Sequence, residues 1–370
     1  MYLGNFKGKG VRNLLPLELE FNPQLNLLIG DNGQGKTNLL EAIYFLATSR
    51  SFRTSQDQEM IQLGAGGIYL GGEVSGVGGD SKIELLYQPP HKEAKINGKS
   101  LPRLIDLIGH LRVVLFSAED IAIIKGGPHL RRRFMDIGIS QTDPVYLNDL
   151  QKYIRILKQR NRLLNEIRDG GRYEDLLDSF DESLVKTGRA IISKRRLMVT
   201  QIGPMVNHIH QEISGRDKEL QLEYKPRIKE EDFFDRLREK RREEISRGLT
   251  LIGPHRDEII FTLDGINARG FASEGEARTI AICLRLADLK YIYQQSGEYP
   301  LLILDDVFSE LDEHRKQYLV NSLRGDIQTF VTAADEHILE DLPLSNSSIF
   351  RVKRGEVWLY PTQVGKAHLE

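Results

Sequence analysis

Residues 30–37 read GDNGQGKT and match the phosphate-binding pattern G-x-x-x-x-G-K-[ST] at every position. In this pattern glycines let backbone N–H groups face phosphate oxygens, Lys36 would reach the β- and γ-phosphates, and the Thr37 hydroxyl would bind Mg²⁺. The predicted nucleotide-binding residues of this loop are Gly30, Asp31, Asn32, Gly33, Gln34, Gly35, Lys36, Thr37 and Asn38. The alternative is a glycine-rich turn that binds nothing. The apolar stretch before the loop and the helical pattern after it favour the phosphate site.

Such a loop needs a metal-holding carboxylate at the end of another buried strand, and LLILDDVF at residues 301–308 supplies two. Adjacent carboxylates repel each other unless a cation lies beside them. We therefore predict that Asp305 holds Mg²⁺ through a water molecule and that Asp306 orients an attacking water. A solvated turn is the alternative interpretation of this acidic pair.

A third motif begins the helical run FASEGEARTIAICLRLA at residues 271–287. Ser273 and Glu276 have the spacing of a capping box, which predicts a helix that starts there. A cap does not require Gly275, because glycine costs about 1 kcal/mol relative to alanine inside a helix. A serine hydroxyl, a bare glycine amide and a helix N-terminus together form a candidate second anion clamp, although capping alone also explains the pattern.

Hydrophobic periodicity predicts which elements position these motifs. Strands are expected at 15–21, 25–30 and 111–116, a helix follows Thr37, and Asn97-Gly98 predicts a hairpin. Leucines and isoleucines three or four apart predict a helical arm from about 140 to 250, with one helix kinked or ended at Pro204. Strands return after residue 255, at EIIFTL, LLILDDVF and TFVTAA. This order predicts an α/β protein with parts 1–137, 138–248 and 249–370, the middle one a helical arm.

Composition excludes several classes of protein. The 370 residues are 40% hydrophobic and 28% charged, and no run is apolar enough to cross a membrane. The single cysteine, Cys283, excludes a disulfide framework and a cysteine-based metal site, and with the absence of a signal-peptide pattern it predicts a cytoplasmic protein. Net charge is −2, yet residues 151–250 hold 23 Lys and Arg against 18 Asp and Glu. That balance of +5 permits an anionic partner.

Ser273-Glu274-Gly275-Glu276 resembles the signature motif of ABC-class ATPases, which contacts ATP held by the P-loop of a partner subunit. Ser309-Glu310-Leu311-Asp312 resembles the D-loop of the same class, with Ser309 and Asp312 as its candidate residues. Nearly the whole chain resembles the RecF family of bacterial recombination mediators. The similarity lies in GDNGQGKTNLLEAIYFLATSRSFRT, VVLFSAEDIAIIKGGPHLRRRFMD, TLIGPHRDE, FASEGEAR and LLILDDVFSELD.

The resemblance implies an ABC/Rad50-like ATPase head, built from both ends of the chain, with an inserted helical arm. It implies ATP and Mg²⁺ as cofactors, an ATP-dependent homodimer on DNA, and weak DNA-stimulated ATP hydrolysis with Lys36, Asp306 and Ser273 as catalytic residues. It also implies cooperation with RecO and RecR in loading a recombinase at gapped DNA, and a part in replication restart and the SOS response.

The sequence departs from the broader ABC pattern at three positions, which limits the residue roles that the resemblance can assign. Asp306 stands where many ABC ATPases have Glu, and a carboxylate displaced by about 1 Å can cost ~10²-fold in rate. Thr332 stands where a switch histidine is expected, and His337 lies too far along the chain. The segment FSAED offers Ser117 and Glu119 where a Q-loop glutamine would be. These differences favour the use of ATP as a switch.

Two basic clusters are candidate DNA contacts. Pro128 suits the first turn of a helix, which places three arginines near its positive end, where an anion would stabilise them. Residues 253–257, GPHRD, form a turn in which Arg256 either pairs with Asp257 in solvent or, with His255, senses nucleotide or DNA. The DNA-binding candidates are Arg131, Arg132, Arg133 and Arg256, together with the basic residues of the arm at 151–250.

Three other functions compete with an ATP-gated DNA clamp. A Rad50- or SMC-type bridging protein needs long coiled coils, and an insert of about 110 residues is too short for them. A transporter nucleotide-binding subunit needs a membrane partner and a switch histidine. A non-hydrolysing scaffold that only binds nucleotide differs from the clamp in its ATPase activity.

Overall fold

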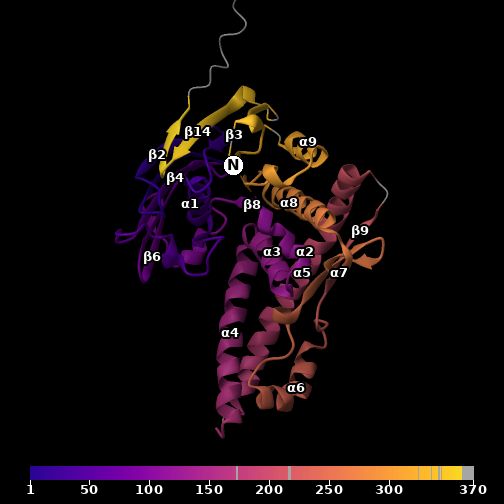
Figure 1. The fold of residues 1–370 in the computed structure, drawn as a ribbon. Coiled ribbons are helices and arrows are strands. Elements are labelled where there is room, and N and C mark those ends of the chain that lie inside the picture. The colour runs from indigo at the N-terminus through magenta and orange to yellow at the C-terminus, as the bar shows by residue number, and fades with distance from the viewer. Residues whose placement is uncertain are drawn as a thin grey trace, which may run out of the picture. The chain divides into compact units, whose positions relative to one another are not determined.

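The computed structural model describes residues 1–171, 174–215, 218–323, 325–334, 336–340, 342 and 344–360. The chain forms two compact units (Figure 1). The first comprises Met1–Asp120 and Asp288–Glu370, and the second comprises Ile121–Ala287. The chain therefore leaves the first unit once and returns to it, as expected for a head built from both ends.

A six-stranded sheet with the order β15-β14-β3-β13-β12-β8 forms one layer of the first unit. Its strands are β3 (Leu25–Ile29), β8 (Val113–Ser117), β12 (Leu301–Asp305), β13 (Thr329–Ala333), β14 (Ser347–Lys353) and β15 (Glu356–Leu359). All neighbours are parallel except β14 and β15. Every residue of β3, β12 and β13 is buried, which explains their continuous apolar sequences.

The other layer is an antiparallel sheet with the order β2-β1-β4-β5-β6-β7. Its strands are β1 (Tyr2–Lys9), β2 (Leu17–Glu20), β4 (Ile68–Ser75), β5 (Ser81–Gln88), β6 (His91–Ile96) and β7 (Lys99–Ser100). The predicted hairpin at Asn97-Gly98 is confirmed, because both residues have positive φ and join β6 to β7. Helix α1 (Lys36–Thr48) contacts strands of both sheets and buries ten of its residues.

The second unit is mainly helical. It contains α2 (Ile121–Lys125), α3 (Pro128–Ser140), α4 (Pro144–Arg168), α5 (Leu176–Ser214), α6 (Phe233–Arg247) and α7 (Ala268–Phe271). Its sheet, β9 (Leu220–Lys225), β10 (Glu258–Leu263) and β11 (Ile266–Asn267), has β10 at the centre. Helices α4 and α5 lie side by side and α6 contacts both (Figure 1). Helix α9 (Glu313–Ser322) belongs to the first unit, and the boundary at 287/288 falls within α8 (Glu274–Ser296).

The predicted arm, 138–248, lies inside the second unit, which is larger than that arm. The unit also includes α2, most of α3, and residues 249–287 with the start of α8. The division into 1–137, 138–248 and 249–370 stays a prediction about functional parts.

Helix α5 excludes one of the two alternatives predicted at Pro204. The helix does not end there but continues to Ser214, and the kink stays a prediction. Proline removes one backbone hydrogen bond, yet Ile202, Val206 and Ile209 are buried on both sides of it. Packing of this apolar face therefore stabilises the helix beyond the proline.

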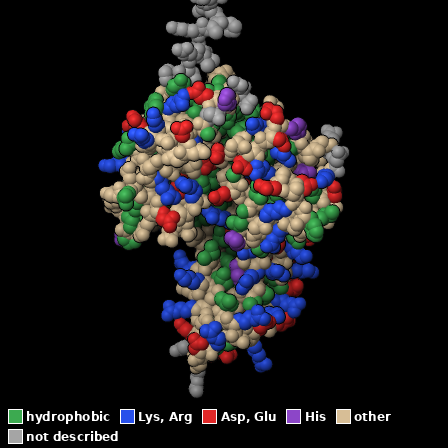
Figure 2. Space-filling model, viewed as in Figure 1, with side chains coloured by type: hydrophobic (Ala, Val, Ile, Leu, Met, Phe, Trp, Pro, Cys, Tyr) green, Lys and Arg blue, Asp and Glu red, His purple; other side chains and the backbone are tan. Residues whose placement is uncertain are grey.

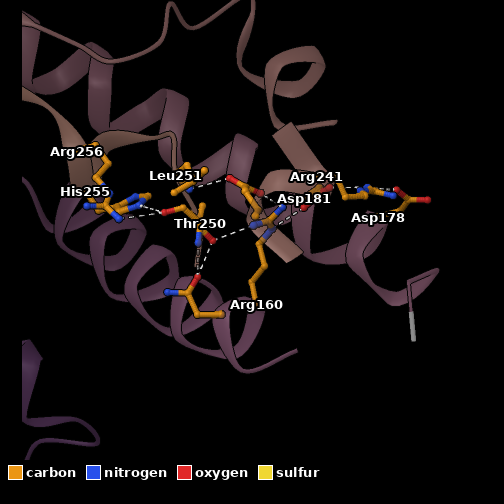
Figure 3. A network of polar contacts seen from close by, with 10 residues as sticks. Arg160, Asp178, Asp181, Arg241, Thr250, Leu251, His255 and Arg256 are labelled. Carbon is orange, nitrogen blue, oxygen red and sulfur yellow. Dashed lines mark hydrogen bonds and ion pairs between the residues drawn. The ribbon is translucent and has the colours of Figure 1, made fainter. Parts of the chain in front are cut away.

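A buried ionic network joins the helices of the arm (Figure 3). Arg160 of α4 pairs with Asp181 of α5 and Glu244 of α6, each at 2.7 Å, and all three side chains are fully buried. Arg160 also donates to the Thr250 hydroxyl at 2.8 Å. Burial raises the pKa of Glu244, and the arginine opposes that shift. One guanidinium thus holds three segments that are distant in sequence.

Replacing Arg160 by methionine should lower the free energy of unfolding by about 3–5 kcal/mol, because Glu244 loses its buried cation and Asp181 keeps its pair with Arg241 alone. Arg162→Met is the matched control, since that side chain is 83% exposed and its loss should change stability by less than about 0.5 kcal/mol. Denaturant unfolding of both variants measures the difference. Equal losses of unfolding free energy in the two variants would show that the buried network adds no more stability than an exposed ion pair.

Candidate phosphate-binding site

The predicted phosphate loop connects β3 to α1 and has the backbone that its glycines allow. Gly35 precedes the first residue of α1 with φ of 123°, a conformation that other residues rarely adopt. A Cβ on Gly30 would lie 2.2 Å from the carbonyl oxygen of Val352 in β14. Asp31 and Asn32 are exposed on the loop. The loop is thus open on one side and tightly packed on the other.

Lys36 is buried at the start of α1, and its ammonium donates to the carbonyl oxygens of Gly30 and Asp31. Burial lowers the pKa of Lys36, whereas the nearby carboxylates of Asp306, Asp305 and Asp31 oppose the shift. The cation therefore lies over the loop, close to Asp305 and Asp306, the acidic pair at the end of β12. Phosphate oxygens would replace its carbonyl partners with stronger, charged acceptors.

Asp305, the last residue of β12, accepts two hydroxyl hydrogen bonds. Thr37 donates to its Oδ1 at 2.9 Å and Thr332 donates to the same oxygen at 3.0 Å. Burial raises the pKa of Asp305, which the two hydroxyl bonds partly offset. Hydroxyl and carboxylate oxygens are the ligands that Mg²⁺ takes in proteins, so Thr37 and Asp305 fit the predicted metal site.

Asp306 is exposed and adopts the left-handed conformation with φ of 55°. Its backbone N–H donates to the Thr332 hydroxyl at 2.8 Å, so one threonine contacts both acidic residues. A non-glycine residue in this conformation is uncommon, and such residues concentrate at functional sites. The threonine that replaces the expected switch histidine thus orients the acidic turn.

Sequence reasoning missed Arg53 as a member of this site. Arg53 donates to Asn38 at 2.8 Å and to Glu41 at 3.3 Å, and its charge opposes the rise in the pKa of Asp305 that burial causes. Glu41 is fully buried in α1 and also binds Arg12 through both oxygens at 3.0 Å. A glutamate within the apolar run TNLLEAIYFLA was the available signal, because a buried carboxylate requires cationic partners.

The other predicted residues of the loop region have partners within the first unit. Gln34 accepts from the backbone N–H groups of Arg354 and Gly355 at 2.7 and 2.9 Å, which ties the loop to the β14–β15 turn. Ser117 pairs with Asp305 in the parallel register of β8 and β12, whereas Glu119 is exposed. Ser117 is therefore the Q-loop candidate that lies beside the acidic turn.

The capping box at the start of α8 is confirmed. Glu276 donates its N–H to the Ser273 hydroxyl at 3.2 Å and accepts from the Ser273 N–H at 2.8 Å. Lys218, with help from Ser273, lowers the pKa of Glu276 to about 2. Ser273 lies in the second unit and Lys36 in the first, so the composite clamp between two copies stays a prediction.

The candidate D-loop residues both have local contacts. The Ser309 hydroxyl donates to the carbonyl oxygen of Asp306 at 2.9 Å, and Asp312 caps α9 by accepting from the Arg315 N–H at 2.9 Å. Ser309 and Asp312 are exposed. Their contact with a partner subunit stays a prediction.

The prediction that Arg131 contacts DNA is wrong for this conformation. Its side chain is 2% exposed, pairs with both oxygens of Glu258 at 2.6 and 3.0 Å, and donates to carbonyl oxygens at the end of α2. The cation satisfies polar groups inside the second unit, which the spacing of the three arginines cannot reveal. Arg132 is half-buried and donates to the Asp257 carbonyl at 2.8 Å, whereas Arg133 is exposed.

The GPHRD turn is held by the arm network, and Arg256 is exposed on it. Asp257 is buried and accepts from the Tyr224 hydroxyl and, at 2.9 Å, from the Arg227 N–H, so the expected solvated pair with Arg256 is replaced by internal bonds. His255 contacts the Thr250 carbonyl at 3.1 Å (Figure 3). Its other ring nitrogen contacts the Tyr153 hydroxyl at 2.6 Å. Because a carbonyl only accepts, His255 carries its proton on Nε2 and accepts from Tyr153 at Nδ1.

Comparison with known proteins decides the family. The chain matches the RecF/RecN/SMC N terminal domain over residues 2–357. It is 40% identical over 367 residues to the DNA replication and repair protein RecF of Exiguobacterium sp. strain AT1b, covering 96% of this chain and 99% of that protein. The chain belongs to the RecF family. The RecF protein of Lactobacillus delbrueckii subsp. bulgaricus is also 40% identical, over 96% of this chain and 97% of the relative.

Solved structures agree with the RecF assignment. The recombination mediator protein RecF with ATP, of the RecFOR pathway, has 35% identity and a TM-score of 0.90 over 97% of this chain and 98% of that one. An Smc head bound to the C-winged helix domain of ScpA has 16% identity and a TM-score of 0.58 over 99% of each chain, which shows a shared fold alone. The predicted α/β head fold is confirmed. No helix within the described ranges is both long and apolar enough to span a membrane.

The His255 environment predicts a pH-dependent stability. Burial, with further effects from Arg256, Arg132 and Arg160, lowers its pKa from 6.5 to about 4. The unfolded chain therefore takes up the proton first as pH falls, so the stabilisation is complete above about pH 6.5 and is lost toward pH 4. Between pH 7 and pH 5 this group should cost about 2 kcal/mol.

His255→Gln should reduce the pH dependence of the free energy of unfolding by that amount, since glutamine keeps a donor and an acceptor but does not titrate. His208→Gln, at a side chain that is 68% exposed, is the control for replacing a histidine by glutamine elsewhere in the second unit. Denaturant unfolding at both pH values measures each variant. An unaltered pH dependence in His255→Gln would contradict the assignment of a neutral, buried imidazole.

Proposed function

We propose that this RecF-family protein is an ATP-gated DNA clamp of recombinational repair and replication restart. The observation that carries the proposal is the contact between Thr37 and Asp305, which joins the phosphate loop to the acidic turn after β12. The solved relative with ATP supports a nucleotide at this loop. The names of the curated relatives, DNA replication and repair protein RecF, support the DNA-directed part of the role.

Different residues of the site would bind the phosphates, hold the metal ion and activate the water. Lys36 and the loop amides bind the phosphate oxygens, and the Thr37 hydroxyl and Asp305 would hold Mg²⁺, which neutralises charge developing on the β- and γ-phosphates. Asp306 orients the attacking water and accepts its proton. Arg53 lies near enough to Asp305 to influence its pKa and adds positive charge to the site.

The short carboxylate of Asp306 supports slow hydrolysis and the use of ATP as a switch. An aspartate reaches about 1 Å less far than a glutamate, and such a displacement lowers rates. ATP would then persist long enough to hold a dimer on DNA, with the Ser273 end of α8 clamping ATP bound to the other copy. A catalytically silent scaffold is the second candidate, because the same short carboxylate also favours it.

The pathway roles follow from the family. The solved relative is described as a recombination mediator of the RecFOR pathway. We infer that this chain works with RecO and RecR in the cytoplasm to load a recombinase at gapped DNA, and that it supports the SOS response. DNA-stimulated ATP hydrolysis would release the clamp after loading.

Asp306→Asn should bind ATP as the parent does but hydrolyse it at least ~100-fold more slowly, because the water loses its base. Its residence on DNA should therefore lengthen. Lys36→Ala is the contrasting variant and should bind ATP ~10- to 100-fold more weakly, since a charge-assisted bond to phosphate is lost. Equilibrium nucleotide binding and steady-state phosphate release separate the two defects. Hydrolysis by Asp306→Asn at the parent rate would exclude the base, and absence of hydrolysis by the parent would favour the scaffold.

ATP, and not ADP, should convert monomer to dimer, because only the γ-phosphate would reach Ser273 of the other copy. Ser273→Arg should weaken the ATP-dependent dimer by about 100-fold or more, as a misplaced charge at an interface costs several kcal/mol. Ser100→Arg, at an exposed serine of β7, is the control with the same added charge. Sedimentation with each nucleotide measures the dimer. A dimer equally populated with ADP would contradict the composite site.

A further inference from the structure

Helix α4 carries a long basic face. Between Asp149 and Glu166 the sequence LQKYIRILKQRNRLLN contains five Lys and Arg residues and no acidic residue. Four of the five cations are exposed, and Arg162 is 83% exposed. We call these four exposed cations the α4 stripe: Lys152, Arg155, Lys158 and Arg162. Arg155, Lys158 and Arg162 follow a spacing of three and four, which places them on one side of the helix.

The opposite side of α4 fixes the direction in which the stripe faces. Tyr153 and Arg160 are buried, and Asn161 accepts from the Thr250 N–H at 2.8 Å. Rotation of α4 about its axis would withdraw the Arg160 cation from two buried carboxylates (Figure 3). The stripe is therefore held toward solvent. Lys and Arg side chains are visible on the side of the second unit along which α4 runs (Figures 1 and 2).

The neighbouring helix α6 is also rich in charged residues, and three of its cations pair with carboxylates of the same helix. Arg236 pairs with Glu239, and Lys240 and Arg247 both pair with Glu243, each at 2.8 Å. On α4 one such pair is present, between Glu166 and Arg162 at the end of the stripe. Among the residues that the structure describes, no carboxylate pairs with Lys152, Arg155 or Lys158.

Like charges three or four residues apart destabilise a helix, so the stripe weakens α4 unless an anion lies against it. From Lys152 to Arg162 the helix rises by about 15 Å. The same length of one strand of duplex DNA carries roughly four phosphates, which is comparable to the four cations of the stripe. The flanking Gln151 and Gln159 are exposed and add hydrogen-bond donors for phosphate oxygens.

We propose that the α4 stripe binds the phosphate backbone of duplex DNA. This inference rests on the proposed DNA clamp and names a surface for its DNA. The occupant is a polyanion with closely spaced charges, because the stripe is a straight row of cations. Backbone contacts of this kind are independent of base sequence.

The test compares two triple variants that each remove three positive charges. In the stripe variant, Arg155→Gln, Lys158→Gln and Arg162→Gln are combined. In the control, Arg236→Gln, Lys240→Gln and Arg247→Gln remove cations that α6 already neutralises. Affinity for a short fluorescent duplex of mixed sequence is measured with ATP over a range of salt concentrations.

The stripe variant should bind ~10- to 100-fold more weakly at low salt, and its slope of log K against log salt should be shallower by about 2 to 3, since each phosphate contact contributes about 0.9. The control should keep the parent slope. A variant with Arg155→Lys and Arg162→Lys should also keep it, which shows that positive charge at these positions, and not an effect on folding, sets the slope.

Equal slopes for the parent and the stripe variant would overturn the proposal while the DNA clamp stands. Equal weakening of the stripe and control variants would overturn it too, because net charge would then explain binding. Loss of binding to poly-aspartate with intact DNA binding would assign the stripe to an acidic protein. A parent that binds no duplex with or without ATP would overturn the clamp and this surface together.

Discussion

The hydrogen bond from Thr37 to Asp305 joins residues 268 positions apart, and the candidate site depends on it. It exists because β3 and β12 are parallel strands on either side of β13, so that their carboxyl ends meet at one edge of a sheet. The loop after β3 and the acidic turn after β12 therefore face each other. Both ends of the chain must be folded before this site can bind a phosphate chain.

Buried charge organises both units in the same way. In the first, Glu41 lies inside α1 and orients Arg12 and Arg53. In the second, Arg160 lies inside α4 and holds Asp181 and Glu244. Each buried charge is compensated by partners from distant segments, so it selects one arrangement of helices and loops. Arg53 is thereby placed near the acidic turn, and α4 keeps its basic side toward solvent.

Charged residues of the second unit have three kinds of surroundings. Arg131 and Arg195 bind carboxylates and carbonyl groups inside the unit, where they replace water. Charged residues of α6 neutralise one another along the helix. In the α4 stripe, Arg162 pairs with Glu166, whereas no carboxylate among the described residues pairs with Lys152, Arg155 or Lys158. These three cations therefore contribute an uncompensated positive field at the surface. The modest excess of positive charge in residues 151–250 is thus concentrated on one side of α4.

The amino-acid sequence by itself determined the features that depend on neighbours along the chain. These are the glycine loop before Lys36, the acidic pair after an apolar strand, the capping box at Ser273 and the Asn97-Gly98 turn, because each requires only a few consecutive residues. The tertiary structure alone decided which cations are buried, why Pro204 does not end α5, and that Thr332 contacts both acidic residues. Those outcomes depend on groups brought together from distant positions, and local spacing is the same for a buried Arg131 as for an exposed Arg133.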